Sequence, residues 1–128
     1  MILLDTSLLI EALGAGGTLA PALRGVLAEG ERVCLPTLVV YEWLRGPRIP
    51  EELHAQQVLF PLEDAVPFGP PEAALAARLY GEVAKPRGRE IDLAIAACAI
   101  SWDASLWTLN ERDFDDIPGV KLMRVGEG

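Results

Sequence analysis

The residues best suited to chemistry in this sequence are four carboxylates spread along the whole chain. Asp5 ends a short apolar run at residues 2–4, and Asp113 follows a strand-like segment at residues 105–108. Glu42 is the only charge in residues 38–44, and Asp92 is the only charge in residues 91–100. Carboxylates that converge without cations repel one another and raise each other's pKa. The pattern therefore predicts a site for Mg²⁺ or Mn²⁺, hard cations that prefer oxygen ligands.

Asp5 has two interpretations. In an open α/β sheet, ligands bind outside the carboxyl ends of the strands, where Asp5 is expected to lie. Asp, Thr and Ser are also common N-caps, so Asp5, Thr6 or Ser7 can simply cap the helix that follows. The three further acids in comparable settings favour a functional site over capping alone.

The strongest physical argument concerns Asp92. Residues 91–100 predict a helix that is apolar on every face apart from Asp92. Such a helix is normally buried within its domain, and an unpaired carboxylate is costly to bury there. The helix dipole offers only about 0.3–1 kcal/mol in the first turn, which is weak compensation for desolvation. Asp92 thus favours a metal or active-site role. For Glu42 a surface position stays open as the alternative, and for Asp113 a solvated turn, with Asp115 and Asp116 expected to face solvent.

The elements that must position these acids alternate between strand and helix. Strands are expected at residues 2–4, 32–35, 105–108 and 120–125. Helices are expected at residues 8–13, 18–29, 37–45 with Thr37 as N-cap, 51–59, 72–84 and 91–102. Turns or loops are expected at residues 14–17, 61–71 and 85–89, and a turn or short helix at residues 111–117. Strands separated by helices indicate an α/β fold with a mainly parallel central sheet, in one domain over residues 1–128.

Composition narrows the class of protein. With 51% hydrophobic residues in a chain of 128, a substantial core is expected. No apolar stretch approaches the roughly 20 residues that span a bilayer, and the N-terminus lacks the features of a signal peptide. Cys34 and Cys98 have apolar neighbours and no metal-ligand spacing, so we expect buried free thiols in a cytoplasmic protein. The net charge of −8 implies that a polyanion is held only locally or through metal ions.

Four short motifs, in this order and spacing, resemble the PIN-domain ribonucleases and in particular the VapC-type toxins of bacterial toxin–antitoxin pairs. The motifs are Leu3-Leu4-Asp5-Thr6-Ser7, Glu42 near an apolar helix start, Asp92-Leu93-Ala94-Ile95-Ala96-Ala97, and Thr108-Leu109-Asn110-Glu111-Arg112-Asp113-Phe114. The resemblance covers nearly the whole chain. It implies a PIN-like three-layer α/β/α fold and a Mg²⁺- or Mn²⁺-dependent endoribonuclease, a hydrolase in which metal-activated water cleaves RNA and leaves a 5′-phosphate and a 3′-hydroxyl.

The resemblance also implies roles for individual residues. Asp5 and Asp92 become primary ligands of one or two ions, Glu42 a third acid and Asp113 a fourth. Whether Asn110 or Asp113 completes the site is left open at this point. The hydroxyl groups of Thr6, Ser7 or Thr108 are expected to orient a ligand.

The sequence also suggests which basic residues contact RNA and which partners the protein binds. Arg87 and Arg89 lie in the basic loop that leads into Asp92 and are candidates to hold the RNA backbone, with a solvated loop as the alternative. The resemblance implies a cognate antitoxin whose tail covers apolar surface and reaches the acidic pocket. It also implies a homodimer, formed through the helices at residues 38–44 and 53–60. No membrane association is expected.

Two other functions are weighed against a ribonuclease. A Mg²⁺-dependent phosphatase of the haloacid-dehalogenase type also has an Asp at the end of its first strand. That chemistry uses a second Asp two positions later, where this chain has Ser7. A catalytically silent PIN-like module that binds RNA or protein is the other alternative, and the presence of all four acids argues against it.

Overall fold

The computed structural model describes residues 1–14 and 16–124, and it is built on a parallel sheet. Within these residues the sheet has four strands in the order β2-β1-β3-β4, and every neighbouring pair is parallel. The strands are β1 (Ile2–Leu4), β2 (Val33–Cys34), β3 (Ser105–Trp107) and β4 (Lys121–Leu122). Leu3 lies opposite Cys34 on one side and Leu106 on the other. The first strand is therefore central, and its carboxyl end meets that of β3.

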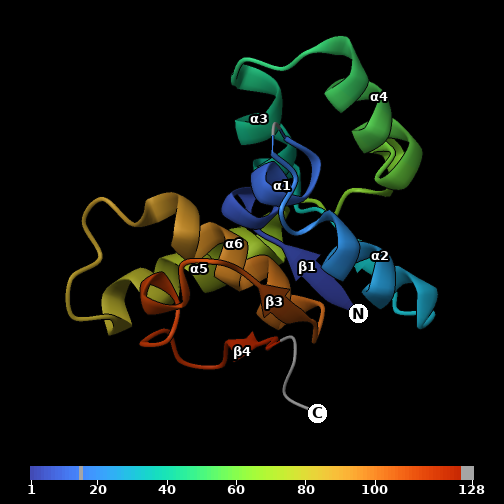
Figure 1. Cartoon of the computed structure of the whole chain (residues 1–128). Coiled ribbons are helices and arrows are strands. Elements are labelled where there is room, and N and C mark those ends of the chain that lie inside the picture. Colours follow the sequence, from blue (N-terminus) through green and yellow to red (C-terminus); the bar gives the residue numbers. More distant parts are fainter. Residues whose placement is uncertain (15, 125–128) are drawn as a thin grey trace.

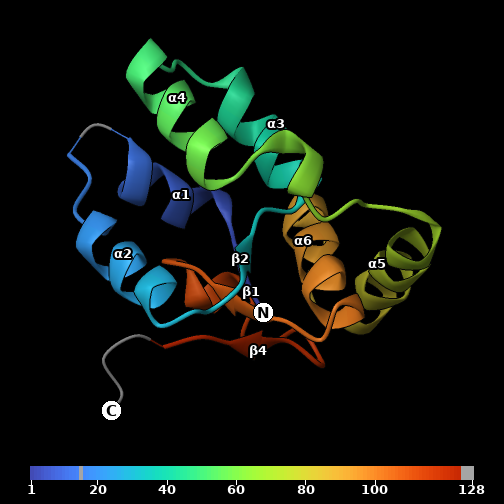
Figure 2. The same ribbon diagram turned by 90° about the vertical axis from the view of Figure 1, so that its right-hand side faces the viewer.

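Helices cover both faces of this sheet, which confirms the predicted three-layer α/β/α fold. They are α1 (Thr6–Leu13), α2 (Ala20–Ala28), α3 (Thr37–Arg45), α4 (Pro50–Leu59), α5 (Pro70–Glu82) and α6 (Glu90–Ser101), with 3-10 turns η1 (Leu62–Asp64) and η2 (Glu111–Asp113). Figure 1 labels these helices and strands on the ribbon. Figure 2 shows α1 and α2 on one side of the sheet and α5 and α6 on the other. The predicted turn at 14–17 and the predicted strand at 120–125 reach positions 15 and 125, which lie outside the described residues.

Most differences from the predicted elements are at helix starts. Helices α4 and α5 begin at Pro50 and Pro70, one and two residues before their predicted starts. Proline is favoured in the first helical turn because its missing N–H would have no partner there. Thr37 was expected as an N-cap, and this is wrong. Pro36 takes the cap position, and the Thr37 hydroxyl instead accepts a hydrogen bond from the Phe68 N–H at 3.3 Å.

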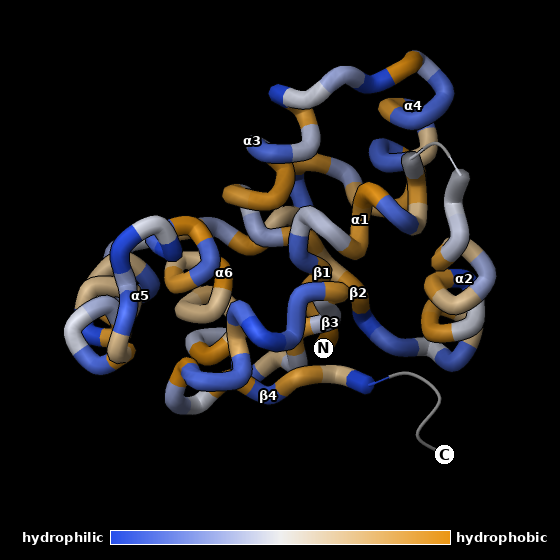
Figure 3. Tube along the Cα trace, turned by 60° about the vertical axis from the view of Figure 1, so that its left-hand side comes forward, coloured by the Kyte–Doolittle hydropathy of each residue, from blue (hydrophilic) through white to orange (hydrophobic). Residues whose placement is uncertain are grey.

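Helix α6 runs through the interior, as its apolar sequence predicts. Every residue from Leu93 to Ala99 is buried, and α6 packs against α5, α3 and β3. In Figure 3 the hydrophobic segments, in orange, gather at the sheet and at the helices packed on it. Cys34 and Cys98 are both buried free thiols, as expected. Within the described part of the chain, no helix is both long and apolar enough to cross a membrane.

Candidate metal centre

Asp5 lies at the middle of the candidate site, at the carboxyl end of the central strand, and its side chain is buried. Its Oδ1 accepts hydrogen bonds from the Ser7 hydroxyl at 2.7 Å and from the Leu8 N–H at 3.0 Å. Its Oδ2 accepts a hydrogen bond from the Thr108 hydroxyl, just past β3. Burial raises the pKa of Asp5, and these three donors partly offset that rise. Capping and a site role are therefore compatible, since Asp5 caps α1 and also joins the ends of two strands.

The hydroxyl groups singled out in the sequence all hold a carboxylate in place. Thr6 Oγ1 donates to Glu42 Oε1 at 2.6 Å, across 36 positions of the chain. Ser7 Oγ and Thr108 Oγ1, which both donate to Asp5, in turn accept the N–H groups of Leu109 at 3.3 Å and Asn110 at 2.9 Å. Two acids are thus oriented by short hydrogen bonds before any cation binds.

Glu42 lies on α3, on the side that faces α1, and its side chain is 20% exposed. The surface position considered for this residue therefore does not describe it well. Its Oε2 is 3.5 Å from the Arg45 guanidinium, one helical turn away and largely exposed. A pair of this length at the surface contributes little to stability, which leaves this oxygen available to a stronger cation.

Asp92 is the third residue of α6 and is half-buried. No hydrogen bond or salt bridge joins its carboxylate to the described residues. Burial, as the largest cause, and the charges of Asp113, Asp5 and Glu42 together raise the pKa of Asp92 to about 6, against a smaller opposite effect of Arg89. Asp92 is therefore the residue on which the charges of the other three predicted acids act.

The segment after β3 supplies the last acid and contains both candidates for it. Asn110 and Asp113 are exposed, Asn110 as the N-cap of η2 and Asp113 as its last residue. Of the neighbouring charges, that of Asp113 raises the pKa of Asp92 most. An open hollow lined by residues 109–113 adjoins this segment. Asp113 thus acts on Asp92 through its charge, while Asn110 carries none, so the choice between the two as the fourth group stays a prediction.

The two arginines of the basic loop differ in what they contact. Arg87 is exposed in the loop between α5 and α6. Arg89 donates two hydrogen bonds to the Asp116 carboxylate, at 2.9 and 2.6 Å, and one to the Asp113 carbonyl at 2.8 Å. Asp116 was expected simply to face solvent. The sequence held no signal for this pair because its members are 27 positions apart in polar segments.

The donor set fits a divalent cation of the Mg²⁺ type. Among residues 1–14 and 16–124, no three Asp, Glu, His or Cys side chains stand close enough to ligate one ion as a group. This argues against a closed cage of protein ligands. Mg²⁺ usually keeps several waters and takes only one or two carboxylates. Asp92, which has no donor and three repelling neighbours, is the side chain whose surroundings most favour a nearby cation.

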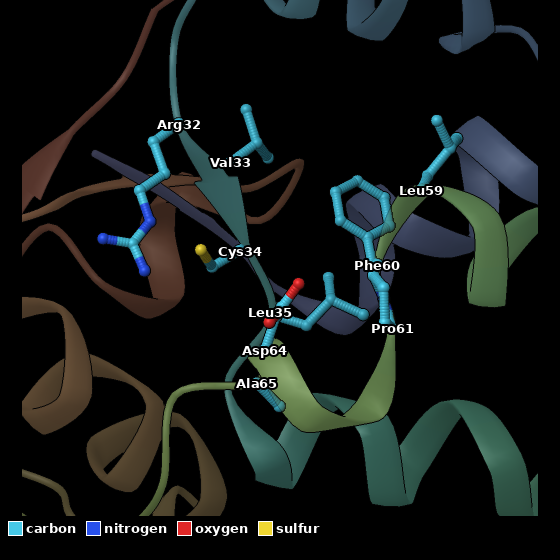
Figure 4. Close-up of a pocket in the computed structure, with 9 residues that line it drawn as sticks. All are labelled: Arg32, Val33, Cys34, Leu35, Leu59, Phe60, Pro61, Asp64 and Ala65. Carbon is cyan, nitrogen blue, oxygen red and sulfur yellow. The ribbon is translucent and has the colours of Figure 1, made fainter.

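A separate and more enclosed cavity of about 220 Å³ lies at the β2 edge of the sheet. Figure 4 shows its lining from β2, the end of α4 and η1, with Arg32, Cys34 and Asp64 among the labelled side chains. None of the residues predicted for the acidic site lines it. Enclosure alone therefore does not locate the candidate chemistry in this molecule.

A comparison of the sequence with models of protein families gives the family of this chain. The model of the PIN domain matches residues 2–120, which is nearly the entire chain. The chain belongs to the PIN-domain family. PIN domains are nucleases that generally use divalent metal ions, so the family agrees with a nuclease and with a cation at the acids.

Solved structures similar to this PIN domain confirm the fold. VapBC2 from Rickettsia felis bound to a DNA fragment from their promoter has 20% sequence identity and a TM-score of 0.71, with 96% of this chain and 98% of that chain covered. DNA-bound VapBC from Salmonella typhimurium has 20% identity and a TM-score of 0.78, with 95% and 96% covered. FitAcB from Neisseria gonorrhoeae has 23% identity and a TM-score of 0.74, with 96% and 97% covered. No curated protein sequence matches the chain.

Proposed function

We propose that this PIN domain is a Mg²⁺- or Mn²⁺-dependent endoribonuclease and the toxin of a VapBC-type toxin–antitoxin pair. The observation that supports the catalytic part is the set of like charges around Asp92. Asp5, Glu42 and Asp113 come from three other elements, and each raises the pKa of Asp92. A fold has little reason to gather four carboxylates unless a cation offsets their repulsion.

In this proposal Asp5 and Asp92 hold one or two ions, and Glu42 and Asp113 complete the site. A bound Mg²⁺ or Mn²⁺ supplies Lewis acidity, which activates water and stabilises the charge that develops on a cleaved phosphodiester. The chain's own groups prepare the site. Ser7, Thr108 and the Leu8 N–H orient the Asp5 carboxylate, and Thr6 orients Glu42. Fixed ligands of this kind lower the reorganisation needed when substrate binds.

Contact with RNA must be local because the chain has a net charge of −8. Arg87, in the loop before Asp92, and Arg112, in η2 beside Asp113, are exposed cations close in sequence to the acids. Both are proposed to contact the phosphate backbone, which supplies much of the affinity for nucleic acid.

The proposed partners are an antitoxin and a second copy of the chain. The similar solved structures of VapBC and FitAcB support the toxin–antitoxin assignment. Helices α3 and α4 expose apolar side chains that a second copy can cover, namely Tyr41, Leu44, Leu53, Val58 and Leu59. An interface of this composition is typical of homodimers.

The proposal is tested by RNA cleavage with purified protein in Mg²⁺, in Mn²⁺ and in EDTA. Wild type is expected to cut only with a divalent ion, and an Asp5→Asn/Asp92→Asn variant is expected to lose at least about a hundredfold in rate. Asp115→Asn is the matched control, since Asp115 is an exposed acid near the site.

Three outcomes contradict the proposal. Equal cleavage by wild type and the double variant assigns the activity to a contaminant. A folded protein without antitoxin that cuts no RNA favours the silent binding module, and turnover of a small phosphate ester instead favours a phosphatase.

A further inference from the structure

Asp113 lies on a short loop that several backbone hydrogen bonds and one buried side chain hold in place. The loop has three internal hydrogen bonds, from the N–H groups of Asp113, Phe114 and Asp115 to the carbonyls of Asn110 and Glu111. Phe114 is 1% exposed and holds the loop to the core one residue after Asp113. The hydrogen bonds are local to the loop, and at Asp113 and Phe114 they use the N–H groups. Holding Asp113 to another element therefore takes a second contact, at its carbonyl.

Arg89 supplies this second contact from the other side of the site. It is the N-cap residue of α6, three positions before Asp92, and its carbonyl accepts the Leu93 N–H at 2.9 Å. Its guanidinium binds the Asp113 carbonyl at 2.8 Å and the Asp116 carboxylate at 2.6 and 2.9 Å. The side chain is only 20% exposed. A planar guanidinium with three directed bonds fixes geometry in a way that a point charge does not.

These contacts argue against the simpler role of holding RNA. Arg89 uses its charge and its two terminal nitrogens on protein oxygens, whereas Arg87, two positions earlier, is exposed. An RNA phosphate would have to displace a bidentate carboxylate partner to reach Arg89. The guanidinium is thus arranged to hold the protein itself.

We propose that Arg89 and Asp116 form a clamp that positions Asp113 against Asp92, so that Arg89 is a positioning residue of the metal centre. The role of the clamp rests on the proposed function, because it matters only where Asp113 and Asp92 serve the same ion. The clamp joins the start of α6 to the η2 loop, two segments 24 positions apart at the Arg89–Asp113 contact. Small displacements of a site residue are costly, since about 1 Å can reduce a rate a hundredfold.

The first test measures the loop in metal-free protein by amide hydrogen exchange. Arg89→Lys keeps the charge and the helix cap but loses the planar fork, and Asp116→Ala removes the other half of the clamp. Both are expected to speed exchange in residues 110–116 about tenfold without affecting α6. Asp115→Ala is the control, with the same charge change one position away. Unchanged exchange in the loop, or faster exchange across the whole protein, overturns the clamp.

The second test is a double-mutant cycle read by calorimetric titration of Mn²⁺. Arg89→Lys is expected to weaken Mn²⁺ binding about fivefold when Asp113 is present and to have no effect in an Asp113→Asn background. Equal weakening in both backgrounds, or none in either, overturns positioning through Asp113. If wild type binds no Mn²⁺, the proposed function fails and the metal role of the clamp fails with it. The exchange experiment still decides whether Arg89 and Asp116 hold the loop.

Discussion

At the scale of single residues, Asp92 is the predicted site acid whose surroundings most disfavour its charged form. It is half-buried, it has three acidic neighbours, and its pKa is raised to about 6 from an ordinary value of 3.8. Since the pKa is higher in the folded state, the folded protein binds more protons than the unfolded chain between these two values. The free energy of unfolding therefore falls as pH rises through this window.

The prediction for Asp92 is a stability gain on neutralisation. In EDTA at about pH 7, Asp92→Asn is expected to raise the free energy of unfolding by on the order of 1 kcal/mol, a figure reduced for partial solvent screening. The gain should shrink as pH falls below about 6 and should be lost below 3.8, where the Asp92 carboxyl of wild type is protonated in both states. Urea unfolding at several pH values measures it, with Asp115→Asn as control. If wild type is instead more stable than Asp92→Asn at neutral pH, this account of Asp92 is contradicted.

At the scale of elements, α6 links the core to the site. Ala96, Ala97 and Ala99 are fully buried, which lets α5, α3 and β3 approach the helix closely. The same helix presents Asp92 in its first turn. Packing along α6 therefore sets where the carboxylate stands.

The prediction for α6 concerns overpacking. Ala96→Leu is expected to reduce the free energy of unfolding by about 1–3 kcal/mol, because a close-packed interior has no room for three more carbons. Thermal or urea unfolding measures the loss. Ala77→Leu, at an exposed position of α5, is the comparison and should change stability little. Equal stability of the two variants would show that α6 has space at Ala96.

How far the sequence predicts these elements depends on how local their causes are. The all-apolar run of α6 and the acid at the end of β1 are local signals, and both predictions agree with the structure. The Thr6–Glu42 and Arg89–Asp116 hydrogen bonds join residues 36 and 27 positions apart and have no local signal. The sequence therefore showed that the acids lie in similar settings, but it did not show the hydrogen bonds that orient them.

At the scale of the whole molecule, strand order explains why Asp5 and Thr108 lie together. Because β1 is central and parallel to β3, Asp5 and Thr108 follow neighbouring strands at the same edge of the sheet. Helices α3 and α6 then bring Glu42 and Asp92 from opposite parts of the chain, and they pack on each other. The PIN domain matches residues 2–120, while a single domain over residues 1–128 stays a prediction.

The most direct test of this account is calorimetric titration of Mn²⁺ into wild type, Asp92→Asn and Asp115→Asn. If the four acids form one metal centre, wild type and Asp115→Asn bind Mn²⁺ alike, and Asp92→Asn loses at least about tenfold in affinity. If all three proteins bind Mn²⁺ equally, or none binds it, the four carboxylates do not form the metal centre of this PIN domain.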